Sequence, residues 1–511
     1  MSKYLYGAAV QGIQDFIFKT NKLQEIVGAS ELVEQICTSE FDDYRKNGED
    51  VVKAAGNIKF IFNEKADCEE AVRAFPKNVM TTAPGITISQ AVVALSDDFN
   101  DDDFAAAIDE LESKLKVQRN KPPKSVTLGL MGIKRANNTG LPVVKSEAVF
   151  DKDGKKVLDE NGKQKMLYLD DATSAKLSKK SMKKLCENSF GSIDGELALE
   201  ISDITDKNDW IAIIHADGNG LGKVVQKVGK KKDVFKQFSQ ELDEATQAAA
   251  HAAYNKLKAE KLFDENGVIP IRPVVLSGDD MTVIIRGDLA VKYAKEFIAA
   301  FERETRRRLS DILTKNDVFA DHKDYLTACA GIAFIKSSYP FYFGYQLAEE
   351  LCGQAKKDTK ALAKERGSED NLPDSCLMFH KVQDSFITNY EAIESRELMA
   401  KVDSKNVPLF KAGPYYLVAP IEGKHSIDEL ESLSKRLDGE EGRGVKSGIR
   451  NWITLRLEGK AKANQRIKRM NQLFSTADQK TISILTDEKY GTCMAYDVLA
   501  YNTIMNQQTN K

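Results

Sequence analysis

Two adjacent aspartates, Asp279 and Asp280, interrupt the apolar sequence VVLSGDDMTVIIR (274–286). Glycine and aspartate are common at the tips of β-hairpins, so this motif taken alone is also typical of an ordinary exposed turn. A chemical interpretation stands beside it, because paired carboxylates at the end of two buried strands can hold a divalent cation. The choice between an exposed turn and a cation site depends on whether another acidic side chain lies beside these two aspartates.

A third aspartate, Asp217, begins the glycine-rich turn DGNGLG (217–222), directly after the apolar stretch WIAIIH (210–215). From about 209 to 390 the periodicity alternates in the order β-α-β-β-α-β, which is typical of the split βαβ or ferredoxin-like fold. In that topology the end of the first strand meets the hairpin between strands two and three. We therefore expect Asp217 to lie close to both aspartates of the hairpin.

The elements that must position these residues follow from the apolar periodicity. The expected strands are 210–215, 271–276, 281–286 and 326–336, and the expected helices are 233–261, one from about 288, and 344–365.

Three carboxylates at one sheet edge would raise one another's pKa unless a cation lies between them. We therefore expect Mg²⁺ or Mn²⁺ to be held by Asp217, Asp279 and Asp280. Carboxylates that hold two such ions about 4 Å apart suit the in-line attack of a hydroxyl group on phosphorus. The predicted chemistry is nucleotidyl transfer, with the three aspartates as catalytic residues and metal ligands.

Glycines beside the aspartates would let a triphosphate approach the backbone without a Cβ atom in the way. The nucleotide-binding residues predicted from the two turns are Gly218, Asn219, Gly220, Ser277 and Gly278. Lys356 and Lys360 lie four residues apart on one expected helix face and could neutralise the phosphates, although a solvated lysine face has the same spacing. The sequence contains no Walker phosphate-binding loop of the form GxxxxGKS or GxxxxGKT.

The five histidines are isolated, and none is followed by an aspartate, so the sequence lacks the motif of HD-type hydrolases. His215 immediately precedes the glycine-rich turn. Its place on an alternating strand is more typical of a buried, hydrogen-bonded histidine than of a metal ligand.

The N-terminal segment repeats the same plan. Its expected elements are a strand at 4–10, a helix at 23–37, two strands within 51–62, a strand at 86–95 and a helix at 102–118. QGIQDF (11–16) stands where the other copy has DGNGLG, and AAGN (54–57) stands where it has SGDD. The metal-binding acids are missing, so this copy is predicted to be a binding or structural module.

Four regions are expected along the 511 residues: 1–145, 146–200, 201–390 and 391–511. The second is polar and contains the turns DKDGKK (151–156) and DENGKQ (159–164), which are typical of a solvated hairpin or of an inserted linker. The fourth is mostly helical. Its basic segment, 450–469 with Trp452 nearby, is either a solvated face or a surface for RNA or a protein partner.

A net charge of -3 provides no global field that would recruit nucleic acid or membrane. No apolar run approaches the ~20 residues that span a bilayer, and the N-terminus lacks a signal-peptide layout, so we predict a cytoplasmic protein without membrane partners. Seven scattered cysteines form no CxxC pair and are predicted to be buried, reduced thiols.

The sequences HADGNGLGK (215–223), LSGDDMTVI (276–284) and AEELCGQAKKDTK (348–360) resemble the second palm domain of the CRISPR polymerases. These proteins are the large subunit of type III CRISPR effector complexes, and their palms are related to GGDEF and adenylyl cyclases. GIQDFIFKTNKLQEIVGASELVE (12–34) resembles the opening of the first palm of the same subunit. The resemblance covers about 1–140 and 200–390.

In that family the second palm makes cyclic oligoadenylates or related signal nucleotides from ATP after target RNA binds. The resemblance implies that Asp217, Asp279 and Asp280 hold the metals and that the helix bearing Lys356 and Lys360 faces the triphosphates. It also implies a second nucleotide site in the first palm. The residues implied there are Gly28, Ala29 and Ser30 at a helix start, together with Gly56 and Asn57.

Three features depart from the family pattern. Ser277 replaces the usual first glycine of the GGDD motif, a change that a tight turn tolerates. No HD nuclease domain precedes the first palm, which argues against DNase activity. The zinc-binding insertion is also absent, because the corresponding RANNTGLPVV (135–144) has no cysteine.

The predicted fold is therefore α+β, with two ferredoxin-like palm domains and a mostly helical C-terminal domain. The predicted function is synthesis of a cyclic oligonucleotide, an oligoadenylate made from ATP, in prokaryotic antiviral defence. One alternative is a catalytically silent, nucleotide-binding or RNA-binding scaffold subunit of an effector complex, and another is a cyclase making mono- or dinucleotides. RNA and other effector subunits are the partners expected at the C-terminal domain.

Overall fold

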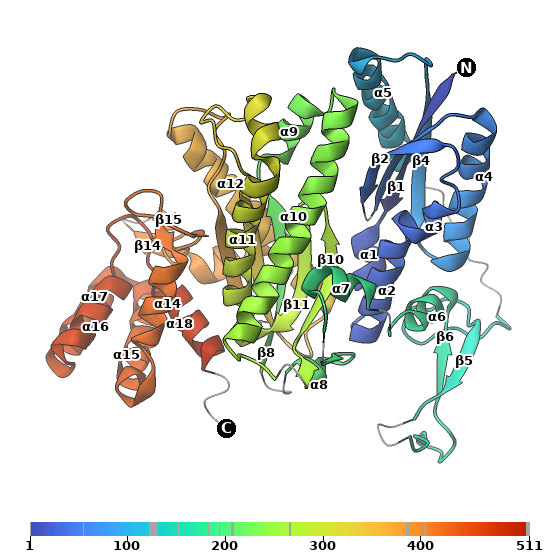
Figure 1. Ribbon diagram of the computed structural model, residues 1–511. Helices are drawn as coiled ribbons and strands as arrows, with labels where there is room; N and C mark the ends of the chain where they lie inside the picture. The colour runs from blue at the N-terminus through green and yellow to red at the C-terminus, as the bar shows by residue number, and fades with distance from the viewer. Residues whose placement is uncertain are drawn as a thin grey trace. The chain divides into compact units, whose positions relative to one another are not determined.

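The computed structural model describes residues 2–54, 56–121, 131–150, 154–181, 183–193, 195–205, 209–264, 267–384, 389–402 and 405–506. The chain divides into two compact units (Figure 1). Unit 1 comprises Met1–Glu187 and Val225–Asp243, and unit 2 comprises Asn188–Val224 and Glu244–Lys511. Each unit has its own β-sheet and helices, so the protein belongs to the α+β class.

The sheet of unit 1 has four antiparallel strands in the order β2-β3-β1-β4. They are β1 (Lys3–Gln11), β2 (Gly48–Ala54), β3 (Asn57–Phe62) and β4 (Thr87–Leu95). The helices are α1 (Ile13–Phe18), α2 (Leu23–Cys37), α3 (Ser39–Asp42), α4 (Lys65–Thr82) and α5 (Asp101–Arg119). The strands, α2 and α5 lie where the sequence predicts them. Helix α4 is not among the predicted elements. It contains Pro76, and proline is unfavourable in the interior of a helix.

The polar region of unit 1 contains the predicted hairpin, formed by β5 (Lys145–Ala148) and β6 (Met166–Leu169). In the turn DENGKQ the carboxylate of Asp159 accepts hydrogen bonds from the backbone of Asn161 and Lys163. The other predicted turn, DKDGKK, begins outside the described residues. Helices α6 (Asp171–Ser178) and α7 (Lys184–Phe190) follow.

The sheet of unit 2 has seven strands in the order β10-β11-β8-β12-β13-β16-β17. They are β8 (Trp210–Gly218), β10 (Ile271–Ser277), β11 (Asp280–Arg286), β12 (Ala328–Lys336), β13 (Cys376–Lys381), β16 (Tyr415–Tyr416) and β17 (His425–Ser426). The first four confirm the predicted strands. The sheet is mixed, because β13 runs parallel to β12 and β17 runs parallel to β16, and these added strands were not among the predicted elements.

The principal helices of unit 2 are α9 (Leu221–Val228), α10 (Lys232–Ala259), α11 (Gly287–Lys315) and α12 (Phe341–Glu365). The first residues of α10 and the last of α9 are grouped with unit 1. Smaller elements are β7 (Glu196–Leu197), α8 (Ile201–Ile204), β9 (Val268–Ile269), α13 (Tyr390–Ile393), β14 (Ala400–Val402) and β15 (Lys405–Val407).

Both faces of the central strands of unit 2 are buried. Helix α12 packs against β8, β12 and β13, and on β12 it approaches Gly331 so closely that a Cβ atom there would lie 1.9 Å from the Ala348 carbonyl oxygen. Neighbouring residues of a strand point to opposite faces, and Ile213 and Ile214 of β8 are both fully buried. Burial on both sides explains why β8 and β12 are almost continuously apolar.

The C-terminal part of unit 2 is mostly helical, as predicted. Its helices are α14 (Ile427–Lys435), α15 (Gly439–Glu458), α16 (Lys460–Leu473), α17 (Thr476–Leu485) and α18 (Ala495–Met505). Trp452 does not belong to an exposed RNA-binding surface, because it is buried against Phe410 with their ring centroids 6.1 Å apart. Arg456 is also internal, with its guanidinium bound to the carboxylate of Glu488.

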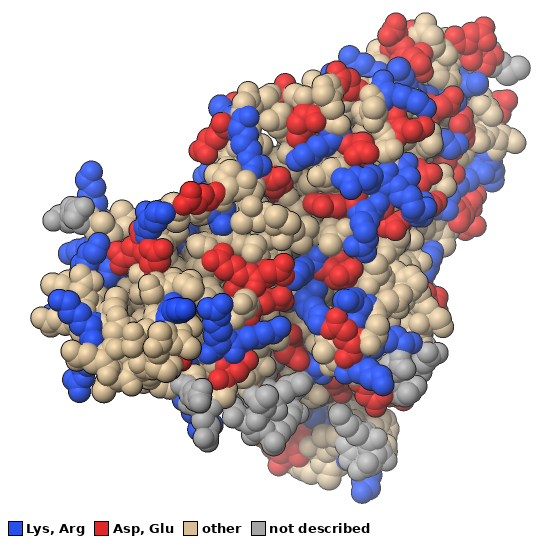
Figure 2. Space-filling model, turned by 60° about the vertical axis from the view of Figure 1, so that its left-hand side comes forward, with Lys and Arg blue, Asp and Glu red and all other residues tan. Residues whose placement is uncertain are grey.

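The described cysteines and the surface agree with the composition. The six cysteines whose side chains are described are all buried and free. Lys, Arg, Asp and Glu side chains are intermixed over the face shown in Figure 2. None of the helices in the described ranges has the length and apolar character needed to cross a membrane.

Replacing Gly331 tests the contact between β12 and α12. Gly331→Ala should lower the free energy of unfolding by about 2 kcal/mol or more, since the new methyl group meets helix backbone that cannot move aside locally. Gly353→Ala is the matched control, because Gly353 lies on the exposed side of α12 with nothing within 4 Å of a Cβ atom. It should raise the free energy of unfolding by up to about 1 kcal/mol. Urea unfolding measures both, and equal effects would contradict the packing described.

A pH dependence of stability is expected from Asp497 on α18. Burial raises the pKa of its carboxyl group to about 7, against the hydrogen bond that Tyr415 donates to it (2.8 Å) and the nearby His425. The folded protein therefore retains this proton between about pH 4 and pH 7, whereas the unfolded chain loses it. The protonated Asp497 therefore stabilises the folded protein at low pH, and this stabilisation is lost as the pH rises towards 7.

Asp497→Asn keeps the acceptor oxygen and removes the titration. The difference between the free energies of unfolding of wild type and variant should shift in favour of the variant from pH 4 to pH 7 and remain level above it. Urea titrations at several pH values measure this difference, and a difference independent of pH would contradict the raised pKa.

Candidate metal and nucleotide site

The hairpin between β10 and β11 presents two of the three aspartates. Ser277 pairs with Asp280, so that Gly278 and Asp279 form a two-residue turn. Gly278 has a φ angle of 60°, the left-handed conformation that favours glycine at the first position of such a turn. Thr246 on α10 is fully buried and donates a hydrogen bond to the Gly278 carbonyl (2.5 Å). This bond fixes the position of the turn relative to α10.

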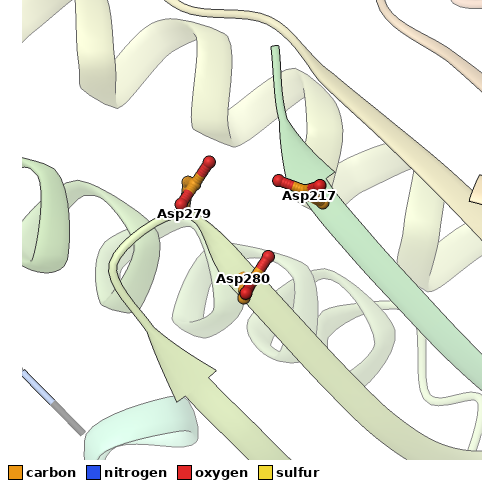
Figure 3. Close-up of side chains that lie close together, drawn as sticks. All are labelled: Asp217, Asp279 and Asp280. Carbon is orange, nitrogen blue, oxygen red and sulfur yellow. The ribbon is translucent and has the colours of Figure 1, made fainter. Parts of the chain in front are cut away.

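The third aspartate arrives from the adjacent strand. Strand β8 lies between β11 and β12, and Asp217 near its end pairs with Cys329. Carboxylate oxygens of Asp217, Asp279 and Asp280 all lie within 4.8 Å of one another. Figure 3 shows the three side chains converging from the end of β8 and the tip of the hairpin. The structure thus brings together the three acids that the sequence pattern placed at one edge.

Gly218 makes the close approach of the two motifs possible. A Cβ atom at Gly218 would lie 2.8 Å from the Cβ atom of Asp279, so any larger residue would push the hairpin away from β8. The absence of a side chain here serves the convergence of the carboxylates as well as access to the backbone.

Asn219 has a different place from the one predicted. Only 1 % of the residue is exposed, and its side-chain amide donates hydrogen bonds to Thr327 (3.1 Å) and to the Cys329 sulfur (3.3 Å). Its backbone N–H donates to the Thr327 carbonyl (2.7 Å). Asn219 was predicted to contact a nucleotide, and in this structure its side chain is used inside the fold. The residue instead anchors the turn that follows Asp217 to β12.

Lys356 of α12 supplies a positive charge at the acidic cluster. Its ammonium group forms an ion pair with Asp217 and donates a hydrogen bond to the Gly218 carbonyl (2.7 Å). Burial alone would lower the pKa of Lys356, but the carboxylate of Asp217 raises it above its ordinary value. The lysine is consequently charged at neutral pH and balances part of the negative charge of the cluster.

Loss of hydration and the neighbouring carboxylates raise the pKa of both hairpin aspartates. Loss of hydration, followed by the charges of Asp280 and Asp217, raises the pKa of Asp279 well above its usual range. Asp280 is exposed on its outer side, yet loss of hydration at its carboxyl group and the charge of Asp217 raise its pKa to about 7. Bringing a divalent cation to this place would relieve the repulsion, and the all-oxygen set of Asp217, Asp279 and Asp280 fits Mg²⁺ or Mn²⁺.

A cavity of about 670 Å³ opens beside the three aspartates, a size suited to a nucleotide. The predicted residues that line it are Asp217, Gly218, Gly220, Asp279, Asp280, Lys356 and Lys360. Ser277 and Gly278 do not line it and serve to form the turn.

The cavity also has walls that the sequence analysis did not identify. Lys364 lines it one turn beyond Lys360, and its position in the same four-residue series could have revealed it. The loop that carries Glu369, Asn371 and Pro373 forms another wall, and it is tied down by an ion pair between Lys223 and Asp370 (3.1 Å). Loop residues of this kind carry no periodic signal, so only the folded chain reveals them.

The nucleotide-binding residues implied for unit 1 are placed differently from the expectation. Gly28 and Ser30 lie in the middle of α2, which begins at Leu23, and not at a helix start. Ser30 is buried and donates its hydroxyl to the Ile26 carbonyl (2.9 Å), and a Cβ atom at Gly28 would lie 1.8 Å from the Lys176 carbonyl oxygen. Their observed contacts are helix packing.

Gly56 and Asn57 lie at the turn between β2 and β3. Gly56 has a φ angle of 85°, and its carbonyl accepts a hydrogen bond from Val10 (2.9 Å). A cavity of about 810 Å³ in unit 1 is lined by Gly12, Asp15 and Lys176 among others, but by none of the five implied residues.

His215 is a core residue, as its strand position indicates. Its ring is 9 % exposed and shares a 3.0 Å hydrogen bond with the Thr282 hydroxyl. Burial lowers the pKa of His215 to about 4, so the ring is neutral at physiological pH.

Comparison with known proteins identifies the segment that holds the three aspartates. Residues 210–364 match the family model described as Cas10/Cmr2, second palm domain. This segment is a Cas10/Cmr2 second palm domain. A search of curated proteins found no match to the chain. The second palm domain contains every residue of the acidic cluster and both predicted lysines of the cavity.

Solved structures extend the similarity to nearly the whole chain. The crystal structure of a Csm1-Csm4 cassette in complex with cA4 matches 98 % of this chain and 69 % of its own, with a TM-score of 0.53 and 14 % identity. The complexes with AMPPNP and with pppApA match over the same shares, with TM-scores of 0.53 and 0.52 and identities of 14 % and 15 %. At such identity the likeness shows a shared fold.

Thermal melting with and without Mg²⁺ tests the acidic cluster as a metal site. Saturating Mg²⁺ should raise the melting temperature of the wild type by a few degrees, because a ligand at about 100 times its Kd stabilises by about 2.7 kcal/mol. Asp279→Asn with Asp280→Asn should remove this shift. Without metal the double variant should melt no lower than the wild type, since two of three crowded carboxylates are gone. Asp311→Asn, an exposed residue of α11, is the control that should keep the full shift, and an equal shift in the double variant would contradict the assignment.

Proposed function

We propose that this protein is a metal-dependent nucleotidyltransferase that makes a cyclic oligonucleotide, an oligoadenylate formed from ATP, and releases pyrophosphate. The observation that carries the proposal is the cluster of Asp217, Asp279 and Asp280 on the wall of a nucleotide-sized cavity. A purely structural ion site would not need three carboxylates next to an open cavity that is also lined by lysines.

The residues of the second palm domain have distinct roles in this proposal. Bound divalent ions would lower the pKa of an attacking 3′-hydroxyl group and neutralise the leaving phosphate oxygens. Asp217, Asp279 and Asp280 hold these ions. Lys360 and Lys364 face the triphosphate, and Lys356 keeps Asp217 and the Gly218 backbone in place.

The ligands of the similar structures support the choice of adenine nucleotides. These structures are Csm1-Csm4 cassettes in complex with cA4, cA3, AMPPNP and pppApA. We propose by analogy that this chain takes ATP and joins it through 3′-hydroxyl attack. We further propose that it works in the cytoplasm in antiviral defence, with RNA and other effector subunits as partners of its C-terminal domain.

The sheet of unit 1 fits a second, degenerate palm. Its strand order β2-β3-β1-β4 repeats the order β10-β11-β8-β12 of the second palm domain. Along the chain, helices follow β1 and β3 in unit 1, as they follow β8 and β11 in the second palm domain. Asn57 occupies the register position that Asp280 holds, opposite the last residue of the preceding strand. We propose that this copy is a ferredoxin-like palm that supports nucleotide binding, with Gly56 and Asn57 at its turn and α2, with Gly28 and Ser30, as its packing helix.

Incubation with labelled nucleoside triphosphates tests the proposed reaction. Purified protein with Mg²⁺ or Mn²⁺ and ATP, with and without RNA, should yield cyclic or linear oligoadenylate and pyrophosphate, identified by chromatography and mass spectrometry. Asp279→Ala with Asp280→Ala should abolish the product, because neither ion can then be held. Asp311→Ala should retain wild-type turnover.

Two outcomes would favour other functions. Production of cyclic mono- or dinucleotides alone would indicate a cyclase. Binding of ATP without any product, with or without RNA, would favour a silent scaffold subunit and contradict the enzymatic proposal.

A further inference from the structure

Another cavity of unit 2 lies towards the opposite end of its strands from the aspartates. It has a volume of about 380 Å³ and is formed by the end of β13 together with α15 and α18. The residues of its lining used below are Lys381, Gln383, Arg450 and Tyr496. Lys381 pairs with Phe334 of β12, which pairs with Ala212 of β8, and Asp217 lies five residues further along β8. Along the strand direction, roughly 17 Å therefore separates Lys381 from the aspartates.

Two cations of this cavity have no anionic partner. No hydrogen bond or ion pair joins the side chains of Lys381 and Arg450 to any residue in the described part of the chain. Other cations of unit 2 do have carboxylate partners: Arg456 binds Glu488, and Lys411 binds Glu394 at 3.0 Å. Lys381 is half-buried and Arg450 is exposed.

A third cation, Lys336, increases the positive charge at this end of the strands. The ammonium groups of Lys336 and Lys381 lie 3.9 and 5.4 Å from the centre of the Trp210 ring. Cation–π contacts of this kind compensate part of the charge of the two ammonium groups. Burial and then the charges of Arg450 and Lys336 lower the pKa of Lys381. Lys381 therefore experiences repulsion from both neighbouring cations.

The neighbouring carboxylate is already engaged. Glu397 accepts a hydrogen bond from the Tyr496 hydroxyl (2.5 Å) and lies 3.7 Å from the buried ring of His380. Gln383 in turn donates to the Tyr496 hydroxyl (2.7 Å). This network fixes the polar wall of the cavity, which Lys381 and Arg450 also line.

We propose that this cavity binds a phosphoryl group, supplied either by an RNA backbone or by a free nucleotide. The planar guanidinium of Arg450 can grip two phosphate oxygens while Lys381 provides a point charge, the combination that recurs in phosphate sites. The volume suits one nucleotide unit or smaller. This site is separate from the proposed catalytic cavity and does not depend on its activity.

Binding of two probes in EDTA tests the proposal on the full-length protein. A fluorescein-labelled single-stranded RNA of about 12 nucleotides is followed by anisotropy, and ATP is followed by calorimetry. Lys381→Gln with Arg450→Gln should weaken at least one of the two by roughly tenfold to hundredfold, as expected for the loss of charged hydrogen bonds. Lys435→Gln with Arg436→Gln removes the same charge from exposed positions of α14 and should leave both affinities unchanged.

The pattern of losses identifies the source of the phosphoryl group. Loss confined to RNA, with a smaller dependence of affinity on salt, assigns an RNA backbone, because each lost phosphate contact lowers the salt slope by about 0.7. Loss confined to ATP assigns a free nucleotide. Arg450→Gln alone changes only an exposed side chain, so it should fold normally and show part of the loss.

Unchanged binding of both probes in the double variant and in Arg450→Gln would overturn the proposal. A poly-glutamate peptide that binds more tightly than either probe, and depends on Lys381 and Arg450, would also overturn it by identifying an acidic protein partner. Thermal melts of all variants confirm that the comparison is made between folded proteins.

Discussion

Electrostatic repulsion among three carboxylates is the constraint on which the rest of the second palm domain depends. Asp217, Asp279 and Asp280 are held within 4.8 Å of one another, a distance at which their negative charges destabilise the folded protein. Such an arrangement persists only because well-packed structure on either side holds it. A divalent cation between the three carboxylates would relieve this repulsion.

Several contacts act together to impose the crowding. Gly218 leaves room for Asp279, Thr246 holds the carbonyl of the hairpin turn, and Asn219 fastens the end of β8 to β12. Lys356 offsets part of the charge through its ion pair with Asp217. Because α12 is held against β12 at Gly331, this lysine has little freedom to leave the cluster. The site is therefore prearranged by residues that are themselves buried.

The two ends of the strands of unit 2 have opposite electrostatic character. At one end the carboxylates outnumber the single lysine that reaches them, and at the other Lys381 and Arg450 have no carboxylate partner. In both places the residues with unbalanced charge line a cavity. The overall net charge of -3 hides this separation, because it averages over both ends.

The sequence by itself determined the strands of both sheets up to β12, the helices that connect the hairpin to its neighbours, and the meeting of Asp217 with Asp279 and Asp280. It could do so because buried strands are continuous apolar runs and because the β-α-β-β-α-β order permits few arrangements. The positions of Lys356 and Lys360 on the cavity wall followed from helical spacing.

Only the tertiary structure decided which polar residues face a ligand and which are used internally. Asn219, Gly28 and Ser30 occur in motifs that suggest nucleotide binding, yet their partners are Thr327, the backbone of α6 and the backbone of α2. Trp452 likewise stands in a basic segment but packs against Phe410. Residue type and local spacing specify what a side chain is able to bind, whereas its actual partner depends on contacts with residues distant in the sequence. That is why the meeting of the three aspartates was predictable and the surroundings of the cavity were not.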